Sequence, residues 1–369
     1  MYTLENQATI DYEKCVKCDG NEYSTIYNYF DNKTDKYNVT FPFNTRVLIP
    51  YLATLIGFEK TILNFHFINF CFCIISIVMI YLLWSKLKIP ITLIHIGLFW
   101  LVFHWTGIIR LNVFDPITVD LPLYTFHASL VYIIFSKKYN WLSLLTLIAI
   151  TQKESFTVYI GLLFIYALIH NKFYENYFPL KPIIAALIIS IITKIVLTYF
   201  YPSSANHPGS IIAVLFYIKQ IFIYPLSIIR WVIAIFIAYG VFILLSIQNL
   251  KQTIKISPEL NILTILTVVS LMLGIVAGGD FTRIIFLGFP FVMTWILILL
   301  KNKSILLSLL SLFLSIPIIR LFEIIPEPIY TSNQHEWYPE FAKMEIVLMW
   351  GLYMIVCYWI ISKTSKLLQ

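Results

Sequence analysis

The sequence predicts an all-α polytopic membrane protein, and three observations support this fold class. Of its 369 residues, 59% are hydrophobic and only 12% are charged, whereas about a quarter of a soluble domain is charged. The mean hydropathy is +0.82. Many apolar runs approach the roughly 17 to 25 residues that a helix needs to cross the hydrocarbon core of a bilayer. We expect about eleven transmembrane helices, at 61–84, 89–109, 121–136, 141–151, 156–170, 182–201, 226–248, 260–277, 284–300, 304–319 and 345–362.

Lysine pairs recur in every second loop of this arrangement and predict its orientation. Short cytoplasmic loops of membrane proteins collect Lys and Arg. The six alternate segments hold twelve lysines and only two acids, Glu175 and Glu259. The lysines are Lys86, Lys88, Lys137, Lys138, Lys172, Lys181, Lys251, Lys255, Lys301, Lys303, Lys363 and Lys366. We therefore expect these segments in the cytoplasm and the remaining loops outside.

The amino-terminal part is expected to form an extracytoplasmic segment at 1–60 that ends in a juxtamembrane helix, ahead of a multi-pass domain at 61–369. Residues 1–45 are polar and lack the apolar region and cleavage signature of a signal peptide. Either this tail is translocated as the first helix inserts, or the chain lacks one upstream helix. Further along, 211–229 fits no membrane pass and predicts an outer interfacial or re-entrant helix.

Two cysteines, Cys15 and Cys18, form a Cys-x-x-Cys pair in the first segment. A zinc site would need two more ligands, and the sequence offers neither a second pair nor a nearby histidine cluster. A small disulfide or two free thiols is therefore favoured over metal binding or redox catalysis. His335, in the outer loop 320–343, is either an acid–base group or a solvated side chain.

The five arginines do not follow the lysines. Arg46, Arg110, Arg230, Arg283 and Arg320 all fall at or near the outer helix ends. Arginine differs from lysine in presenting a planar, permanently charged fork that matches a phosphate or carboxylate with two hydrogen bonds. Each arginine alone could pair locally or extend to lipid phosphates, but the set favours a site for an anionic lipid headgroup on the outer face.

Acidic residues gather on the same side, and two motifs there are candidates for a site. The helix before TQKES, 151–155, is only eleven residues long, which covers about 16 Å of a core about 30 Å thick. Lys153 and Glu154 should then lie below the outer surface, where they either neutralise each other or face a ligand cavity. In GGDFTR, 278–283, Asp280 and Arg283 are three residues apart and can pair or flank one ligand.

Four stretches of the sequence resemble membrane glycosyltransferases of the bacterial GT-C superfamily: CDGNEYSTIY at 18–27, FPFNTRVLIP at 41–50, TQKES at 151–155 and GGDFTRIIFLGFP at 278–290. The predicted topology is similar too. The resemblance implies a donor sugar on a polyprenyl phosphate and an early acidic residue that acts as base or helps to bind a divalent metal. That acid would be Asp19, with Asp11 as second choice. Arg46, Arg283 and Lys153 would lie near the donor phosphate. Such enzymes normally carry a transmembrane helix before the acidic loop, which this sequence does not contain.

The resemblance implies sugar transfer to a glycan or lipid acceptor on the outer face of a bacterial cytoplasmic membrane, during assembly of the cell envelope. The chemistry fits, because a carboxylate can activate a hydroxyl while cations stabilise the leaving phosphate. No nucleic-acid partner is expected. The alternatives are a polymerase of lipid-linked oligosaccharides, a transporter or flippase, and a scaffold without chemistry. Against transport, the polar residues gather on one face and no internal repeat is evident.

Overall fold

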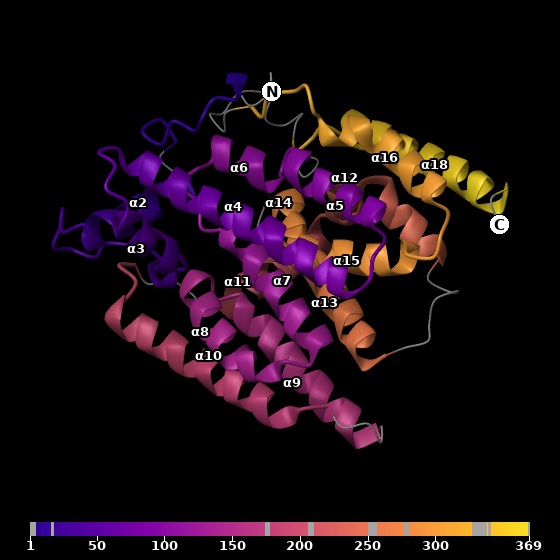
Figure 1. The fold of residues 1–369 in the computed structure, drawn as a ribbon. Coiled ribbons are helices and arrows are strands. Elements are labelled where there is room, and N and C mark those ends of the chain that lie inside the picture. Colours follow the sequence, from indigo (N-terminus) through magenta and orange to yellow (C-terminus); the bar gives the residue numbers. More distant parts are fainter. Residues whose placement is uncertain are drawn as a thin grey trace.

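A computed structural model shows a bundle of helices with the amino-terminal segment packed on its side (Figure 1). It describes residues 5–15, 18–173, 178–205, 210–249, 257–276, 280–326, 338 and 341–367. All regular elements in these ranges are helical. The first half contains α2 (Asp19–Phe30), η1 (Phe43–Thr45), α3 (Leu48–Thr54), α4 (Thr61–Lys86), α5 (Ile91–Phe103), α6 (Ile108–Phe114), α7 (Leu121–Ser136), η2 (Tyr139–Trp141), α8 (Leu142–Gln152) and α9 (Phe156–Phe173). The second half contains α10 (Leu180–Phe200), α11 (Ser210–Ile223), α12 (Leu226–Asn249), α13 (Pro258–Val276), α14 (Phe281–Leu287), α15 (Phe289–Leu300), α16 (Ile305–Ile319) and α18 (Met344–Leu367).

The long apolar helices are those of an integral membrane protein. Within the described ranges, seven helical segments are long and apolar enough to cross a membrane, or eight if α14 and α15, bent by 67° at their junction, form one span. Large apolar side chains on their outer surfaces are exposed, as lipid contact requires; Ile195 on α10 is 63% exposed and Leu352 on α18 is 64% exposed. A helix occupies each of the eleven predicted ranges, but α7, α8 and α16 are not among the segments long and apolar enough to cross a membrane. The number of eleven crossings stays a prediction.

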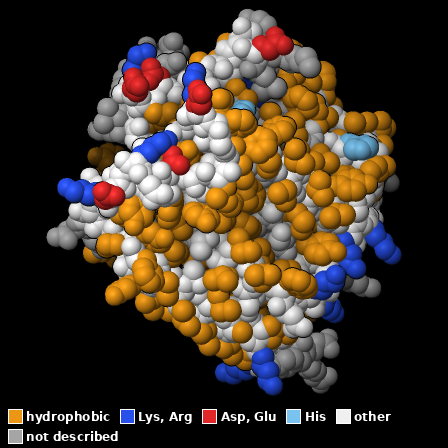
Figure 2. All heavy atoms as spheres, turned by 60° about the vertical axis from the view of Figure 1, so that its left-hand side comes forward, with side chains coloured by type: hydrophobic (Ala, Val, Ile, Leu, Met, Phe, Trp, Pro, Cys, Tyr) orange, Lys and Arg blue, Asp and Glu red, His pale blue; other side chains and the backbone are white. Residues whose placement is uncertain are grey.

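Charge is distributed unequally between the two ends of the bundle. On α7, Asp120 precedes the first residue and Lys137 follows the last. On the α14–α15 pair, Asp280 lies before the start and Lys301 lies after the end. Figure 2 shows a broad hydrophobic surface with basic side chains alone near its lower rim and with acidic and basic side chains together at its upper edge. The charged site residues therefore lie opposite the lysine-bearing ends. Lys251 and Lys255 lie outside the described residues.

The amino-terminal segment packs against the bundle through α2, η1 and α3. Asn64, at the start of α4, donates a hydrogen bond to the hydroxyl of Tyr27 on α2 at 2.9 Å. The backbone amide of Val47 donates to the carbonyl of Thr151, at the end of α8, at 3.0 Å. The predicted juxtamembrane helix corresponds to α3, while the domain boundary at residue 60 stays a prediction. These contacts fix α2 beside the tips of the membrane helices.

The predicted interfacial helix at 211–229 is interrupted. α11 ends at Ile223 and α12 begins at Leu226, because Pro225 lacks the amide hydrogen that a continuing helix needs. Phe222 near the end of α11 is 83% exposed and Leu215 is 58% exposed. Such a short apolar helix suits the membrane interface.

Gly240 interrupts α12 with a backbone conformation of φ 60° and ψ −151°, which is essentially restricted to glycine. A Cβ atom there would lie 2.5 Å from Oγ of Ser315 and 2.6 Å from the ring of Trp100. We expect Gly240→Ala to lower the free energy of unfolding by about 1–3 kcal/mol from the backbone alone, with the steric clash in addition. Thermal unfolding of the detergent-solubilised protein measures this.

The matched control is Gly161→Ala on α9, where a Cβ atom has no neighbour within 4 Å. That variant should be as stable as the wild type or slightly more stable, because alanine favours a helix over glycine. Equal unfolding midpoints for the two variants would contradict the account of Gly240.

Candidate functional site

A cavity of about 290 Å³ brings together residues from the ends of α2, α6 and α14. Its described lining is mostly apolar or aromatic, including Trp105 and Phe341, and carries four charged side chains. These are Asp19, Asp115, Asp280 and Arg283. Arg283 is the only lysine or arginine among the described lining residues. One guanidinium therefore faces three carboxylates in a space large enough for a sugar-sized group.

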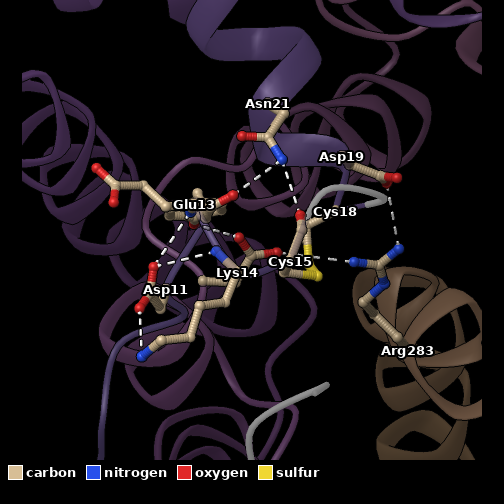
Figure 3. The surroundings of a disulfide bond; sticks show 10 residues. Asp11, Glu13, Lys14, Cys15, Cys18, Asp19, Asn21 and Arg283 are labelled. Atoms are coloured by element: carbon tan, nitrogen blue, oxygen red, sulfur yellow. Dashed lines mark hydrogen bonds and ion pairs between the residues drawn. A yellow bond between two sulfur atoms is a disulfide. The ribbon is translucent and has the colours of Figure 1, made fainter. Parts of the chain in front are cut away.

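The Arg283 guanidinium lies at the centre of an ion-pair cluster. Its Nη2 is 3.1 Å from Asp280 and 3.6 Å from Asp19. Figure 3 shows the ion pair between Asp19 and Arg283. Its Nη1 is 3.8 Å from Asp115, and its Nε is 3.8 Å from Asp120. Nε is buried and has no hydrogen-bond partner among the described residues. The cluster holds Arg283 in place without saturating its hydrogen-bond donors.

Local sequence explains how Asp115 and Asp120 reach this cluster. Pro116 disfavours helical conformation in the residue before it, so α6 ends at Phe114 and Asp115 adopts φ −125° and ψ 72°. Asp120 then precedes the first residue of α7. Both acids are buried, with side-chain exposures of 11% and 6%. The short loop thereby turns two carboxylates into the protein.

The TQKES tip lies beside the cluster, and its two charges do not pair with each other. Lys153 binds Asp120 at 2.6 Å. Gln152 donates a hydrogen bond to the carbonyl of Val119 in the same loop. Glu154 pairs instead with Arg46. Lys153 and Glu154 were both predicted to contact a ligand, but neither is among the described residues that line the cavity. Lys153 is linked to the cluster only through its ion pair with Asp120.

Arg46 is bound on several sides within the protein. Its Nε and Nη2 donate to the Glu154 carboxylate at 3.0 and 2.6 Å, and its Nη1 donates to the hydroxyl of Tyr23 at 3.0 Å. The Arg46 side chain is only 8% exposed and does not line the cavity. Because Tyr23 belongs to α2, this pair ties the helix that begins at Asp19 to the tip of α8.

The other three arginines, Arg110, Arg230 and Arg320, take part in contacts with the carboxyl-terminal half of the bundle. Arg110 donates to the carbonyls of Arg320 at 2.7 Å and Glu323 at 2.6 Å, where α16 has ended and leaves carbonyls to be satisfied. Arg230 donates to the carbonyl of Ala342 at 3.1 Å. The structure therefore does not bring the five arginines to one anion site: Arg283 lines the first cavity, and Arg230 lines a separate cavity along α11.

The two predicted catalytic acids lie in different places. Asp19 begins α2 and lines the cavity. Asp11 pairs with Lys14 at 2.8 Å and is not among the lining residues. Cys15 and Cys18 form a disulfide on the cavity wall, and Asn21 donates to the carbonyl of Cys15 at 2.8 Å (Figure 3). Of the two alternatives left open by the sequence, a disulfide or two free thiols, the structure shows the disulfide, and it lies directly before Asp19.

The pKa values of the two loop carboxylates, Asp115 and Asp120, are shifted in opposite directions. Burial raises the pKa of Asp115 to about 7, although the Tyr12 hydrogen bond and Arg283 oppose this shift. Burial acts in the same direction on Asp120, but Lys153 and Arg283 outweigh it and lower the pKa of Asp120 to about 2. Around neutral pH, Asp115 can therefore exchange a proton while Asp120 stays charged.

Asp115 and Asp120 were not predicted as site residues, because acids in a loop are usually solvated. The signal in LNVFDPITVD was the pair of acids flanking a proline in a short connection between two apolar helices. Their burial depends on the distant Arg283 and Lys153, which the local pattern does not reveal. His335 lies outside the described residues, as do Gly278 and Gly279.

The carboxylates are not arranged as a metal site. Across the described ranges, no group of three or more His, Cys, Asp and Glu side chains could hold a metal ion. The four aspartates instead surround a guanidinium, with Arg283 at distances of 3.1 to 3.8 Å. This arrangement of the described residues does not fit the divalent metal that the resemblance offers as an option.

A second cavity of about 500 Å³ adjoins the first. It lies along α11 and the start of α12, and its described lining is largely apolar. Phe341 lines both cavities, and Phe281, two residues before Arg283, lines the second. The cavity that holds Arg283 among carboxylates thus lies next to a largely apolar cavity, which contains Arg230 and runs beside the exposed apolar helix α11.

Comparisons with other proteins give no assignment. No protein-family model, curated protein or solved structure matches this chain.

Proposed function

We propose that this protein is a GT-C-type glycosyltransferase that moves a sugar from a polyprenyl-phosphate donor to a glycan or lipid acceptor. The reaction takes place on the extracytoplasmic face of a bacterial cytoplasmic membrane, within a bundle of about eleven crossings. The observation that carries the proposal is the cavity with Arg283 among carboxylates, located at the end of the bundle opposite the lysines. The positive-inside rule assigns that end to the outside.

The two kinds of charge in this cavity match the two needs of the reaction. A sugar leaves its carrier when positive charge stabilises the departing phosphate, and Arg283 supplies that charge. An acceptor hydroxyl becomes a good nucleophile when a carboxylate takes its proton. Asp19, the acid identified by the resemblance, lies at 3.6 Å from Arg283 and lines the same cavity. The sugar would therefore be held between the Arg283 cation and the carboxylates of the cavity.

The adjoining apolar cavity supports a donor carried on lipid. A polyprenyl chain is hydrocarbon and gains about 0.8 kcal/mol for each buried CH₂ group. The second cavity meets the first at Phe341 and is lined by α11 side chains such as Ile221 and Ile223. A chain lying there would place its phosphate near Arg283. The buried ion pair between Arg46 and Glu154 would position the helix tips without contacting the donor.

Transfer in membrane vesicles tests this proposal. Vesicles that contain the protein are supplied with a polyprenyl-phosphate hexose labelled in the sugar, together with a cell-envelope extract as acceptor. We expect label in a new product that carries one added sugar. A ladder of products would favour the lipid-linked oligosaccharide polymerase. Label that crosses the bilayer while still attached to its carrier would favour a flippase and overturn the proposed transfer.

A further inference from the structure

The buried carboxylate of Asp115 has a different setting from the other acids of the cavity. Its Oδ1 accepts a hydrogen bond from the Tyr12 hydroxyl at 2.6 Å. The Tyr12 oxygen in turn accepts from the backbone amide of Ile117 at 3.0 Å. Because that amide approaches the oxygen, the hydroxyl proton of Tyr12 is directed to Asp115. The other oxygen, Oδ2, lies 3.8 Å from Nη1 of Arg283, beyond hydrogen-bond distance.

Accessibility and pairing distinguish Asp115 from the neighbouring acids. Asp120 is bound to Lys153 at 2.6 Å and does not line the cavity. The Asp19 and Asp280 side chains are 40% and 41% exposed, at the open side. Asp115 lines the cavity and is 11% exposed. It is therefore the most buried carboxylate that a ligand in the cavity would meet.

From this geometry we infer that Asp115, not Asp19, accepts the proton of the acceptor hydroxyl, and that Tyr12 is its positioning residue. This inference rests on the proposed function. Oδ1 is held by Tyr12, and Oδ2 faces the cavity beside Arg283. Asp19 then orients Arg283 and the acceptor at the open side of the cavity.

The step balances without a further reactant. The acceptor oxygen forms a bond to the anomeric carbon of the sugar while the bond from that carbon to the phosphate oxygen breaks. The electron pair of the broken bond leaves with the polyprenyl phosphate, next to Arg283. The hydroxyl proton passes to Oδ2 of Asp115 and returns to solvent through the open side of the cavity before the next turnover.

The charges that face Asp115 suit this role. Tyr12 and Arg283 favour its ionised form, while burial and the negative charges of Asp19 and Asp120 disfavour it. The pKa of Asp115 is raised to about 7 as a result. A base that titrates near neutral pH combines a sizeable ionised fraction with real affinity for the proton.

Rates of sugar transfer between pH 5.5 and 9 test the inference. For the wild type we expect the rate to rise with pH and to level off above about 7, as Asp115 ionises. Asp115→Asn should lower kcat by about 100-fold or more, within the range for loss of a general base. Asp19→Asn should lower the rate less. Because the charge of Asp19 raises the pKa of Asp115, this variant should keep the pH-dependent rise and move its midpoint to lower pH.

Tyr12→Phe separates a positioning role from a structural one. The Tyr12 hydrogen bond lowers the pKa of Asp115, so its loss should move the midpoint to higher pH and lower the rate more at pH 6 than at pH 9. A purely structural defect would lower the rate equally at all pH values. The matched control is Tyr51→Phe, on α3 and 49% exposed, which should leave the midpoint in place.

The outcomes distinguish this inference from the proposed function. If the wild type transfers sugar from no polyprenyl-phosphate donor, the proposed function fails and the inference fails with it. If the wild type is active while Asp115→Asn keeps more than about a tenth of its kcat, only the inference fails. An unshifted profile for a folded Tyr12→Phe variant would also overturn it. Thermal unfolding of each variant establishes that it is folded.

Discussion

Replacing Arg283 with glutamine should abolish sugar transfer, with kcat lowered about 100- to 1000-fold, the loss expected when one preorganised stabilising group is removed from a developing oxyanion. Arg283 is the only cation among the described residues that line the cavity. Without it, the leaving phosphate would face Asp19, Asp115 and Asp280 with no compensating charge. The measurement is single-turnover transfer from a labelled polyprenyl-phosphate hexose by purified, folded protein.

Two control variants define what Arg283 contributes. Arg283→Lys keeps the charge but loses the fork that binds two oxygens at once, so it should recover part of the activity. Lys14→Gln removes a surface cation that is 69% exposed and pairs with Asp11; it should transfer sugar at the wild-type rate. Full activity in the glutamine variant at position 283 would show that the phosphate binds elsewhere.

Removing Glu154 should produce the largest loss of stability. Arg46 and Glu154 form a two-point ion pair with side-chain exposures of 8% and 19%. Glu154→Ala leaves a buried guanidinium without its carboxylate, which typically costs about 3–5 kcal/mol. We expect the thermal unfolding midpoint in detergent to fall sharply. The tie between α2 and the tip of α8 would also loosen, so transfer should fall as well.

Two controls accompany Glu154→Ala: a double variant that removes both charges of the pair, and a variant that breaks an exposed ion pair. Arg46→Met combined with Glu154→Met removes both charges and should be more stable than Glu154→Ala, since a neutral pair leaves no uncompensated charge. Asp31→Asn breaks an exposed pair with Lys33 and should change stability little. A Glu154→Ala protein as stable as Asp31→Asn would contradict the structural role of the pair.

The contribution of this pair should also depend on pH in a defined direction. Burial alone would raise the pKa of Glu154, but Arg46 outweighs it and the net pKa is lowered from 4.5. A carboxylate with a lowered folded-state pKa contributes stability that is fully present above its unfolded value. The stabilisation should therefore be complete above pH 4.5 and be lost as the pH falls through the lower, folded-state value.

The helical class and the helix positions could be predicted because hydrophobic composition and loop lysines are local properties of the chain. The number of crossings could not be predicted. For short apolar helices such as α7 and bent pairs such as α14–α15, the sequence does not show whether they cross the membrane. The break at Gly288 and Pro290 was within a single predicted run at 284–300. An apolar composition shows that a helix is shielded from water, but it does not show whether lipid or protein surrounds that helix.

The arginine pattern indicated the helix ends where the candidate cavity lies, but it could not distinguish one arginine from another. Arg46 and Arg283 look equivalent in the sequence, each at an outer helix end. In the structure, Nε, Nη1 and Nη2 of Arg46 each donate a hydrogen bond to Glu154 or Tyr23, whereas Arg283 has a buried Nε without a hydrogen-bond partner among the described residues. The difference arises from contacts between segments more than 100 residues apart, which a single sequence does not encode in any local pattern.

The central claim is that the cavity around Arg283 releases a sugar from a lipid-linked phosphate. A donor labelled separately in its sugar and in its polyprenyl chain, added to purified protein with an envelope acceptor, tests this claim most directly. The two labels should separate in equal amounts, into glycosylated acceptor and free polyprenyl phosphate, and Arg283→Gln should prevent this separation. If both labels stay together on one molecule for the wild type, with or without movement across the bilayer, the account is contradicted.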